Sequence, residues 1–167
     1  DIGDKKRANA AKLIADLISN LPQGVFYEED GHVVNSCNIG GISAGDIKVT
    51  NIINTDAQAN YSIRSSSRKK EEELKSKMSL TVDEFNINNK DIAEATIEFE
   101  EHLPPFEKVD DDYIPTIFEK AANKVGVKPD ITSFHAGAET HIYANKTNAN
   151  DEKFVPYLIG LATVCNM

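Results

Sequence analysis

An amide, a guanidinium and a pair of glycines follow one another in the first half of the chain, and groups of these types are suited to holding a peptide-like substrate. Asn51 lies in the run Thr-Asn-Ile-Ile, Arg64 ends the run Ser-Ile-Arg, and Gly40-Gly41 precedes both. We expect them on adjacent β-strands, where the guanidinium clamps a carboxylate through two hydrogen bonds and the amide donates to a carbonyl oxygen. A second interpretation stays open, in which Asn51 caps a turn and Arg64 pairs with a surface carboxylate.

The groups that carry out hydrolysis have no comparable arrangement in this chain. Ser133 lies two residues before His135, but no Gly-x-Ser-x-Gly turn surrounds it. His135 and Glu139 have the four-residue spacing that can place two metal ligands on one helix face, with His141 nearby, whereas a catalytic zinc site takes three protein ligands. We therefore expect no catalytic residue and no complete metal site here. The sequence predicts part of an enzyme rather than a whole one.

Composition favours a soluble protein that binds neither nucleic acid nor an anionic membrane. The 167 residues include 18 Lys and Arg against 27 Asp and Glu, a net charge of -9, and 40% are hydrophobic. Phosphates of nucleic acid or of lipid head groups would repel such a surface. Cys37 and Cys165 match no zinc or redox spacing and predict two free thiols in a reducing cytoplasm. No apolar run approaches membrane-spanning length, and Asp1 is not a methionine, so we expect a processed or excised chain.

Hydrophobic spacing predicts a helix, a set of strands, a second helix and a further strand. Apolar and polar residues alternate from Ala57 to Arg64, which predicts a strand with Arg64 on its polar face. The serines 65–67 supply caps for the charged helix that follows. In chain order, the expected elements are a helix over 5–21, strands over 25–27 and 32–39, breaks at Gly40-Gly41 and Gly45-Asp46, a strand over 57–64, the charged helix, and a strand over 97–100 that Pro104-Pro105 ends.

The fold class that these elements predict is α+β. Residues 1–106 lack only an opening strand to form a split β-α-β (ferredoxin-like) sandwich, an antiparallel sheet with two helices on one face. Residues 107–167 are expected to form an α/β fragment, whose helix begins at 110–112 and ends at Gly126. A short strand over 131–134 and an apolar run over 155–161 are expected to follow that helix.

Taken in order, the motifs resemble those of the lid, or dimerisation, domain of co-catalytic zinc peptidases. They are Asp-Lys-Lys-Arg-Ala-Asn-Ala-Ala-Lys-Leu-Ile-Ala-Asp-Leu-Ile near the start, then Asn-Ile-Gly-Gly, Thr-Asn-Ile-Ile and Ser-Ile-Arg. Peptidase T, aminoacyl-histidine dipeptidase, carboxypeptidase G and succinyl-diaminopimelate desuccinylase belong to this family. The later run Phe-His-Ala-Gly-Ala-Glu-Thr-His-Ile-Tyr is similar to a segment in the C-terminal part of the family's catalytic domain, so the resemblance covers essentially the whole chain.

The resemblance implies the substrate-binding lid and dimerisation segment of a zinc-dependent di- or tripeptidase that hydrolyses peptide (amide) bonds. By motif match, Asn51 and Arg64 would bind the substrate or the tetrahedral intermediate. Gly137 would contribute to substrate binding, and Glu139 takes the acidic position of its motif. Two zinc ions would activate water in the intact parent, with their ligands outside this chain, and the segment alone is expected to be inactive. The expected partners are a short peptide and a second copy of the lid.

The departures from the family pattern are also specific. Most of the family's metal ligands and its general-base glutamate precede the lid and have no counterpart here. The lid histidine of the family is expected just before Asp1, and the final metal-binding histidine just after Met167. A rival interpretation is a non-catalytic α+β module for dimerisation or small-ligand binding. That module explains the acidic surface and the missing chemistry, but not the occurrence of Asn51, Arg64 and the His-Ala-Gly-Ala-Glu run together.

Overall fold

The chain forms two compact units in the computed structural model, residues 1–100 and residues 101–167. The structure describes residues 8–107, 109–129 and 137–160. Within these residues the first unit contains the sheet and two helices, and the second unit contains two further helices.

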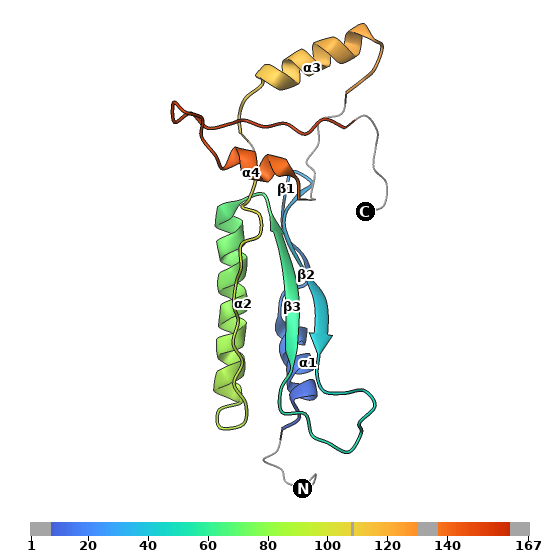
Figure 1. Ribbon diagram of the computed structural model, residues 1–167, viewed down its shortest axis with the longest axis vertical. Coiled ribbons are helices and arrows are strands. Elements are labelled where there is room, and N and C mark those ends of the chain that lie inside the picture. Colours follow the sequence, from blue (N-terminus) through green and yellow to red (C-terminus); the bar gives the residue numbers. More distant parts are fainter. Residues whose placement is uncertain (1–7, 108, 130–136, 161–167) are drawn as a thin grey trace. The chain divides into compact units, whose positions relative to one another are not determined.

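A three-stranded antiparallel sheet and two helices make up the first unit (Figure 1). Helix α1 (Ala10–Asn20) is followed by strands β1 (Gly24–Glu29), β2 (His32–Ser43) and β3 (Gln58–Ser65), and then by helix α2 (Arg68–Asn88). The strands lie in the sheet in the order β1-β2-β3. The α+β fold class is confirmed, and these five elements form where the hydrophobic spacing predicts them.

Short polar side chains fix the beginnings of both helices. The side chain of Asn9 accepts a hydrogen bond from the Ala11 backbone N–H at 2.9 Å, and Ser67 Oγ accepts one from Lys70 at 3.4 Å. Such N-caps satisfy backbone donors that have no partner inside the helix. The cap predicted within residues 65–67 is therefore confirmed at Ser67.

Strand β2 contains a bulge at the glycine pair. Its register with β3 pairs Ile39 with Tyr61 and Gly41 with Asn60, which leaves Gly40 as the extra residue. The break expected at Gly40-Gly41 is therefore a bulge inside β2 and not an end of the strand. The β2–β3 ladder therefore continues through both glycines to Ser43.

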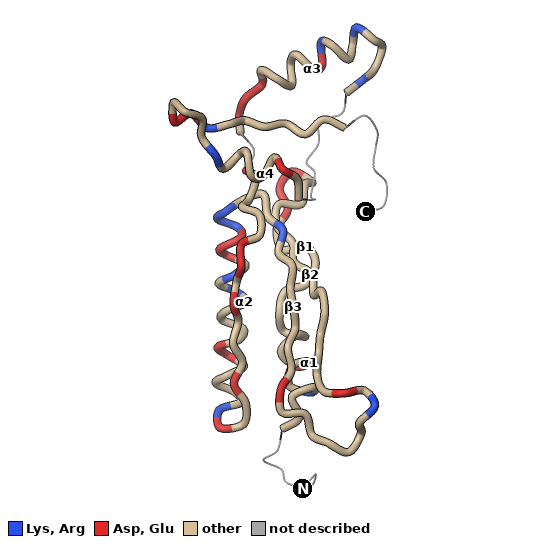
Figure 2. Tube along the Cα trace, in the orientation of Figure 1, with Lys and Arg blue, Asp and Glu red and all other residues tan. Residues whose placement is uncertain are grey.

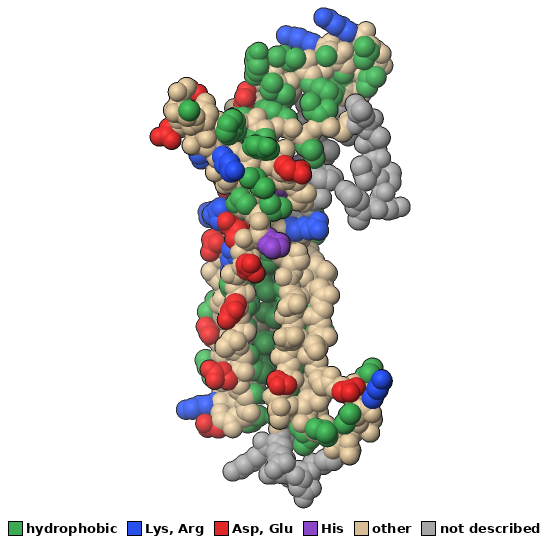
Figure 3. Space-filling view, viewed as in Figure 1, with side chains coloured by type: hydrophobic (Ala, Val, Ile, Leu, Met, Phe, Trp, Pro, Cys, Tyr) green, Lys and Arg blue, Asp and Glu red, His purple; other side chains and the backbone are tan. Residues whose placement is uncertain are grey.

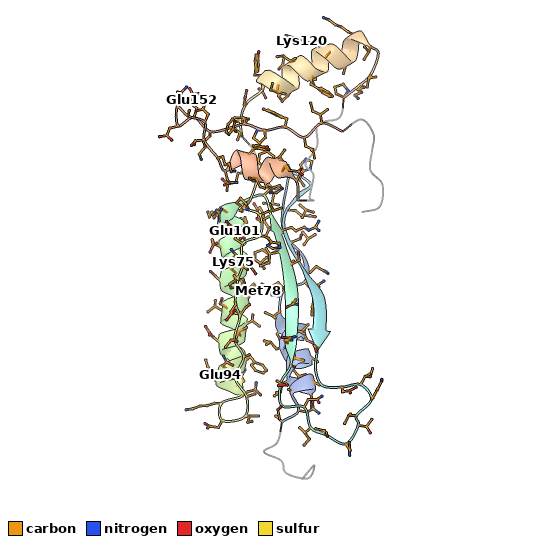
Figure 4. The ribbon with its side chains drawn as sticks, in the orientation of Figure 1. Lys75, Met78, Glu94, Glu101, Lys120 and Glu152 are labelled. Carbon is orange, nitrogen blue, oxygen red and sulfur yellow. The ribbon has the colours of Figure 1, made fainter. Side chains whose placement is uncertain are left out.

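Helix α2 packs on the sheet through one apolar stripe. Leu74 and Met78 are 0% and 1% exposed and form the core cluster with Cys37 of β2, against which Tyr61 and Ile63 of β3 pack. Figure 4 labels Met78 on α2, and Figure 3 shows the hydrophobic side chains gathered between this helix and the strands. One face of the sheet is therefore the buried face, and the opposite face is open.

Charged side chains occupy the remaining faces of α2, where Figure 2 shows both signs interspersed. Lys75 Nζ lies 2.5 Å from a Glu71 carboxylate oxygen, as the four-residue spacing predicts. Glu73, which the spacing places opposite Lys77, instead pairs with Lys70 at 2.7 Å. Glu71 is itself buried at the edge of the apolar stripe, whereas the more exposed Lys70–Glu73 pair contributes only about 0.3–0.5 kcal/mol. The buried stripe is therefore the main attachment of the helix.

The strand predicted over 97–100 is wrong. Residues 93–100 run beside α2 in Figure 1 and pair with no strand among the described residues. The side-chain amide of Asn86 instead takes both backbone groups of Ala95, accepting from its N–H at 2.7 Å and donating to its C=O at 2.9 Å. Ile97 packs against the core cluster. The segment has the apolar alternation of a strand, but a ladder also needs a neighbouring backbone.

The second unit begins with a helix that follows the sequence signals. Helix α3 (Tyr113–Lys124) has Asp112 as its N-cap residue and Pro115 in its first turn, where a missing N–H costs nothing. Gly126 follows its end with a φ of 75°, a left-handed conformation that glycine adopts without strain. The predicted start and stop of this helix are confirmed.

The rest of the second unit has little regular structure in the part that is described. Helix α4 (Glu139–Ala144) is short, and Thr147 and Lys153 form an isolated bridge. Residues 155–160 form no strand, and the strand predicted over 131–134 lies outside the described residues. None of the helices in the described part of the chain is both long and apolar enough to cross a membrane.

Leu74→Ala tests the central packing contact. Removing a fully buried leucine side chain is expected to lower the free energy of unfolding by about 2–5 kcal/mol, because transfer and cavity terms both act. Leu80 is the matched control, since it lies on the same helix but is 62% exposed; Leu80→Ala is expected to cost about 0.5 kcal/mol or less. Urea unfolding followed by circular dichroism measures both, and equal losses would contradict the packing described here.

Cys37 makes the stability of the first unit depend on pH. The thiol is 3% exposed and donates to the Pro22 carbonyl at 3.0 Å, and burial raises its pKa above the ordinary value of 9.0. The unfolded thiol loses its proton first, so this stabilisation is present below pH 9 and is lost as the pH rises further, by at most about 1.4 kcal/mol per unit. Unfolding of the wild type and of Cys37→Ala between pH 8 and 10 measures the effect. The free energy of unfolding is expected to fall less steeply with pH in the variant than in the wild type. Parallel curves would contradict a contribution from the Cys37 thiol.

Candidate functional site

Arg64 lies on the open face of the sheet. Along β3, half-buried residues alternate with exposed ones, and Arg64 belongs to the exposed set. It pairs with Ser36 of β2. The polar face predicted for Arg64 is therefore the face that no helix of the first unit covers. The exposed members of the alternation are Gln58, Asn60, Ser62 and Arg64.

Asn51 is exposed and lies in the loop over 44–57 that joins β2 to β3. The expectation that Asn51 and Arg64 stand on adjacent strands is therefore wrong. Residues 50–53 have the apolar character of a strand, but no backbone pairs with them among the described residues. Ile52 is 65% exposed and Ile47 is 97% exposed, so the loop buries little apolar surface.

Asn54 anchors the base of this loop. Its carbonyl accepts from the N–H of Ala10, the first residue of α1, at 2.9 Å, and its side-chain amide donates to the Ala44 carbonyl at 3.4 Å. Gly45 packs against the same side chain with a φ of +70°, and a Cβ there would lie 2.1 Å from Asn54 Oδ1. Only glycine fits that position, so this pair of residues sets where the loop leaves β2.

Asn51 and Arg64 belong to opposite ends of the β2–β3 ladder. Arg64 pairs with Ser36, whereas the loop begins after the pair Ser43–Gln58, and 64 minus 58 is six residues along β3. At about 3.3 Å per residue, these two levels are roughly 20 Å apart. Figure 1 shows the loop extending beyond its end of the sheet. Within one chain, the structure does not bring these two side chains together on one small ligand.

A hollow of about 180 Å³ opens on the sheet at the glycine bulge. Its lining is Gly41, Ile42, Ser43, Gln58 and Asn60. Gly41 stands opposite Asn60, and a Cβ added to it would meet no atom within 4 Å. The space beside Asn60 therefore exists because the register places a residue without a side chain there. A larger cavity of about 340 Å³ between α1 and α2 is lined by none of the predicted site residues.

Gly137 and Glu139 lie in the second unit, at the beginning of α4. A Cβ on Gly137 would approach Leu103 Cδ1 to 2.7 Å, so the leucine would have to move for any larger residue. Glu139 is exposed in the first turn of the helix, where a carboxylate is favoured by the helix dipole. This geometry is compatible with a structural role for both residues. Their role in substrate binding stays a prediction.

His141 is the described histidine nearest to the predicted His-Ala-Gly motif. Its Nδ1 lies 3.1 Å from the Pro104 carbonyl, and its ring meets Phe106 edge-on at 5.8 Å. These contacts tie α4 to the segment that precedes α3. Ser133 and His135 lie outside the described residues. Among the residues that are described, no group of three or more His, Cys, Asp and Glu side chains could hold a metal ion.

Comparison with known proteins identifies the first unit. Residues 3–90 match the family model described as "Peptidase dimerisation domain", which is more than half of the chain. The chain belongs to the peptidase dimerisation domain family. The match begins before α1 and ends just after α2, so the dimerisation domain comprises the sheet and both of its helices.

Two solved structures share the fold of this dimerisation domain. An aminopeptidase, PepT, from Bacillus cereus ATCC 10987 has 24% sequence identity and a TM-score of 0.64, and a tripeptidase from Staphylococcus aureus subsp. aureus Mu50 has 20% and 0.66. Each comparison covers 80% of this chain and 34% of the solved chain, so this chain spans about a third of the length of those peptidases. No curated protein gives a significant sequence match.

Two residues that shape the site carry no motif of their own. Asn60 lies an even number of residues from Arg64, and the alternation along β3 is a signal that places both on one face. Asn54 has no such signal, because its hydrogen-bond partners, Ala10 and Ala44, are distant in sequence. The turn residues Gly45-Asp46 indicate a break there, but not what holds the loop.

Gly45→Ala is expected to loosen the loop that carries Asn51. The new Cβ meets the Asn54 side chain, and the left-handed backbone is strained for alanine, so the free energy of unfolding should fall by at least about 1 kcal/mol. Hydrogen exchange of residues 44–57 should also become faster. Gly41→Ala is the control, because its Cβ meets nothing and its backbone is not left-handed. Identical exchange in the two variants would show that the Asn54 contacts do not anchor the loop.

Proposed function

We propose that this chain is the substrate-binding lid and dimerisation segment of a zinc-dependent peptidase that hydrolyses di- or tripeptides. The family match over residues 3–90 carries the proposal. The two similar structures, an aminopeptidase and a tripeptidase, agree with a substrate that is a short peptide. Residues 1–106 would form the lid and residues 107–167 a piece of the catalytic domain.

Arg64 is the residue that we assign to the substrate carboxylate. Its guanidinium stands on the open face of a strand whose other face is packed in the core, so its backbone is held while its side chain remains accessible. A planar guanidinium matches a carboxylate through two parallel hydrogen bonds, which makes it selective for a free peptide terminus. Asn51 would donate its amide to a carbonyl oxygen, but not to that of a short peptide held at Arg64 of the same chain, because the two residues lie roughly 20 Å apart.

The metal chemistry belongs to the parent enzyme. Two zinc ions held by residues outside this chain would activate a water molecule and polarise the peptide carbonyl. The described residues offer no cluster to hold either ion, and their part is to bind and enclose the substrate. Gly137 and Glu139 would contribute substrate contacts from the second unit. Closure of the lid excludes water, and a second copy of the lid completes a homodimer. A cytoplasmic location suits the free thiol of Cys37, while Cys165 lies outside the described residues.

Arg64→Ala in the intact parent tests the assignment. Loss of a bidentate, charge-assisted pair is expected to lower kcat/KM for di- and tripeptides by roughly 100-fold or more. Arg64→Lys is expected to lose less, because lysine keeps the positive charge but cannot donate two parallel hydrogen bonds from a planar group. Lys69→Ala is the control, since it removes an exposed cation at the start of α2. Circular dichroism confirms that each variant is folded.

Two outcomes would count against the proposal. Equal activities of Arg64→Ala and Lys69→Ala would remove Arg64 from the substrate site. A wild-type parent that cleaves no short peptide in the presence of zinc would favour the non-catalytic module, which the acidic surface and the missing catalytic groups also fit.

A further inference from the structure

One stretch of the open face, from the pair Ser43–Gln58 to the pair Ser36–Arg64, has a uniform chemistry. Its eight residues form four cross-strand pairs, contain no acidic and no aliphatic side chain, and include a single charge, Arg64 at one end, beyond which β2 continues with Val34 and His32 on the same face. Seven of the eight are exposed, and Ser36 is half-buried. The pairs are Ser43–Gln58, Gly41–Asn60, Asn38–Ser62 and Ser36–Arg64.

We propose that this face binds a short peptide in an extended conformation, with the terminal carboxylate at Arg64 and the backbone running along β3 past Ser62 to Asn60. The inference rests on the proposed function and adds Asn60 and the hollow at Gly41 as the features that select peptide length. In a chain with a net charge of -9, a stretch of strand surface whose only charge is the guanidinium of Arg64 favours an anionic end group.

The distance from Arg64 to Asn60 is comparable to the length of a tripeptide. Asn60 and Arg64 are four residues apart on one strand, which is roughly 13 Å, and Ser62 lies halfway between them. A fully extended tripeptide spans at most about 10–11 Å and a dipeptide about 7 Å. With the carboxylate held at Arg64, a dipeptide ends near Ser62, whereas the amino-terminal residue of a tripeptide reaches the side chain of Asn60.

The side chains along this path suit a peptide backbone. An asparagine offers both amide donors and a carbonyl acceptor, and a serine hydroxyl both donates and accepts, so N–H and C=O groups of an extended chain can find partners. These side chains are uncharged, so Arg64 is the only charged group of the protein on this path that loses water when the peptide binds. Removing a full charge from water is the costly part of burying polar groups.

The hollow provides room for the first side chain of the tripeptide. Its volume of about 180 Å³ is roughly six times the share of liquid volume that one water molecule occupies. It lies beside Asn60, and its depth depends on Gly41, whose missing side chain leaves space that no other atom fills. A Cβ at position 41 therefore enters the hollow without meeting another atom, and a valine there is expected to reduce the free volume.

Kinetics of the intact parent on a matched set of peptides tests the inference. Trialanine, dialanine and leucyl-dialanine are compared for the wild type, Asn60→Ala, Gly41→Val and the control Asn88→Ala, which removes an exposed amide on α2. Asn60→Ala is expected to raise KM for trialanine about 10-fold, as for a lost hydrogen bond of ordinary strength, and to leave dialanine unchanged. Gly41→Val is expected to raise KM for leucyl-dialanine more than for trialanine.

The outcomes separate this inference from the proposed function. If the wild-type parent cleaves these peptides and Asn60→Ala behaves like Asn88→Ala, or if it weakens dialanine as much as trialanine, the path along β3 is wrong while the peptidase assignment stands. If Gly41→Val affects both tripeptides equally, the hollow does not receive a side chain. A wild-type parent without peptidase activity overturns the proposed function itself.

Discussion

The packing of α2 against one face of the sheet is the constraint on which the rest of this domain depends. Leu74 and Met78 close over Cys37 and leave the opposite face open. Because side chains alternate along a strand, burying Tyr61 and Ile63 obliges Asn60, Ser62 and Arg64 to point the other way. A slip of β3 by one residue would bury the guanidinium, so the apolar contacts that stabilise the domain also orient its polar face.

The parts of the fold that sequence predicts are those with a strong local signal. Period-2 alternation locates β3, helical spacing locates α1, and the serine cluster locates the start of α2. The polar side of Arg64 follows from the same alternation. Each of these features depends on residues within a few positions of one another, so tertiary contacts did not need to be known.

The failures arise where a partner distant in sequence decides the structure. Residues 50–53 and 97–100 have strand-like composition, yet neither finds a neighbouring backbone among the described residues. Asn86 binds the polar groups of Ala95 in place of a strand, and Asn54 ties the loop to the start of α1. The sequence likewise marks Gly40-Gly41 as unusual, but only the register with β3 makes one of them the bulge and the other the floor of a hollow.

For function, the separation of Asn51 and Arg64 has a direct consequence. One residue rests on a strand that the core holds, and the other on a loop with exposed apolar residues and few contacts beyond Asn54. A site on a rigid strand positions a ligand more narrowly than a site on a loop. The account therefore assigns recognition of the peptide terminus to β3, and contacts that need adjustment to the loop over 44–57.

The central claim is that this domain serves a metal-dependent enzyme acting on short peptides. The most direct measurement is hydrolysis of a panel of di- and tripeptides by the intact parent, with and without a metal chelator and after zinc is restored. The account predicts cleavage that the chelator abolishes and zinc recovers. Cleavage that is insensitive to the chelator, or no cleavage of any peptide by a folded, zinc-loaded parent, would contradict it.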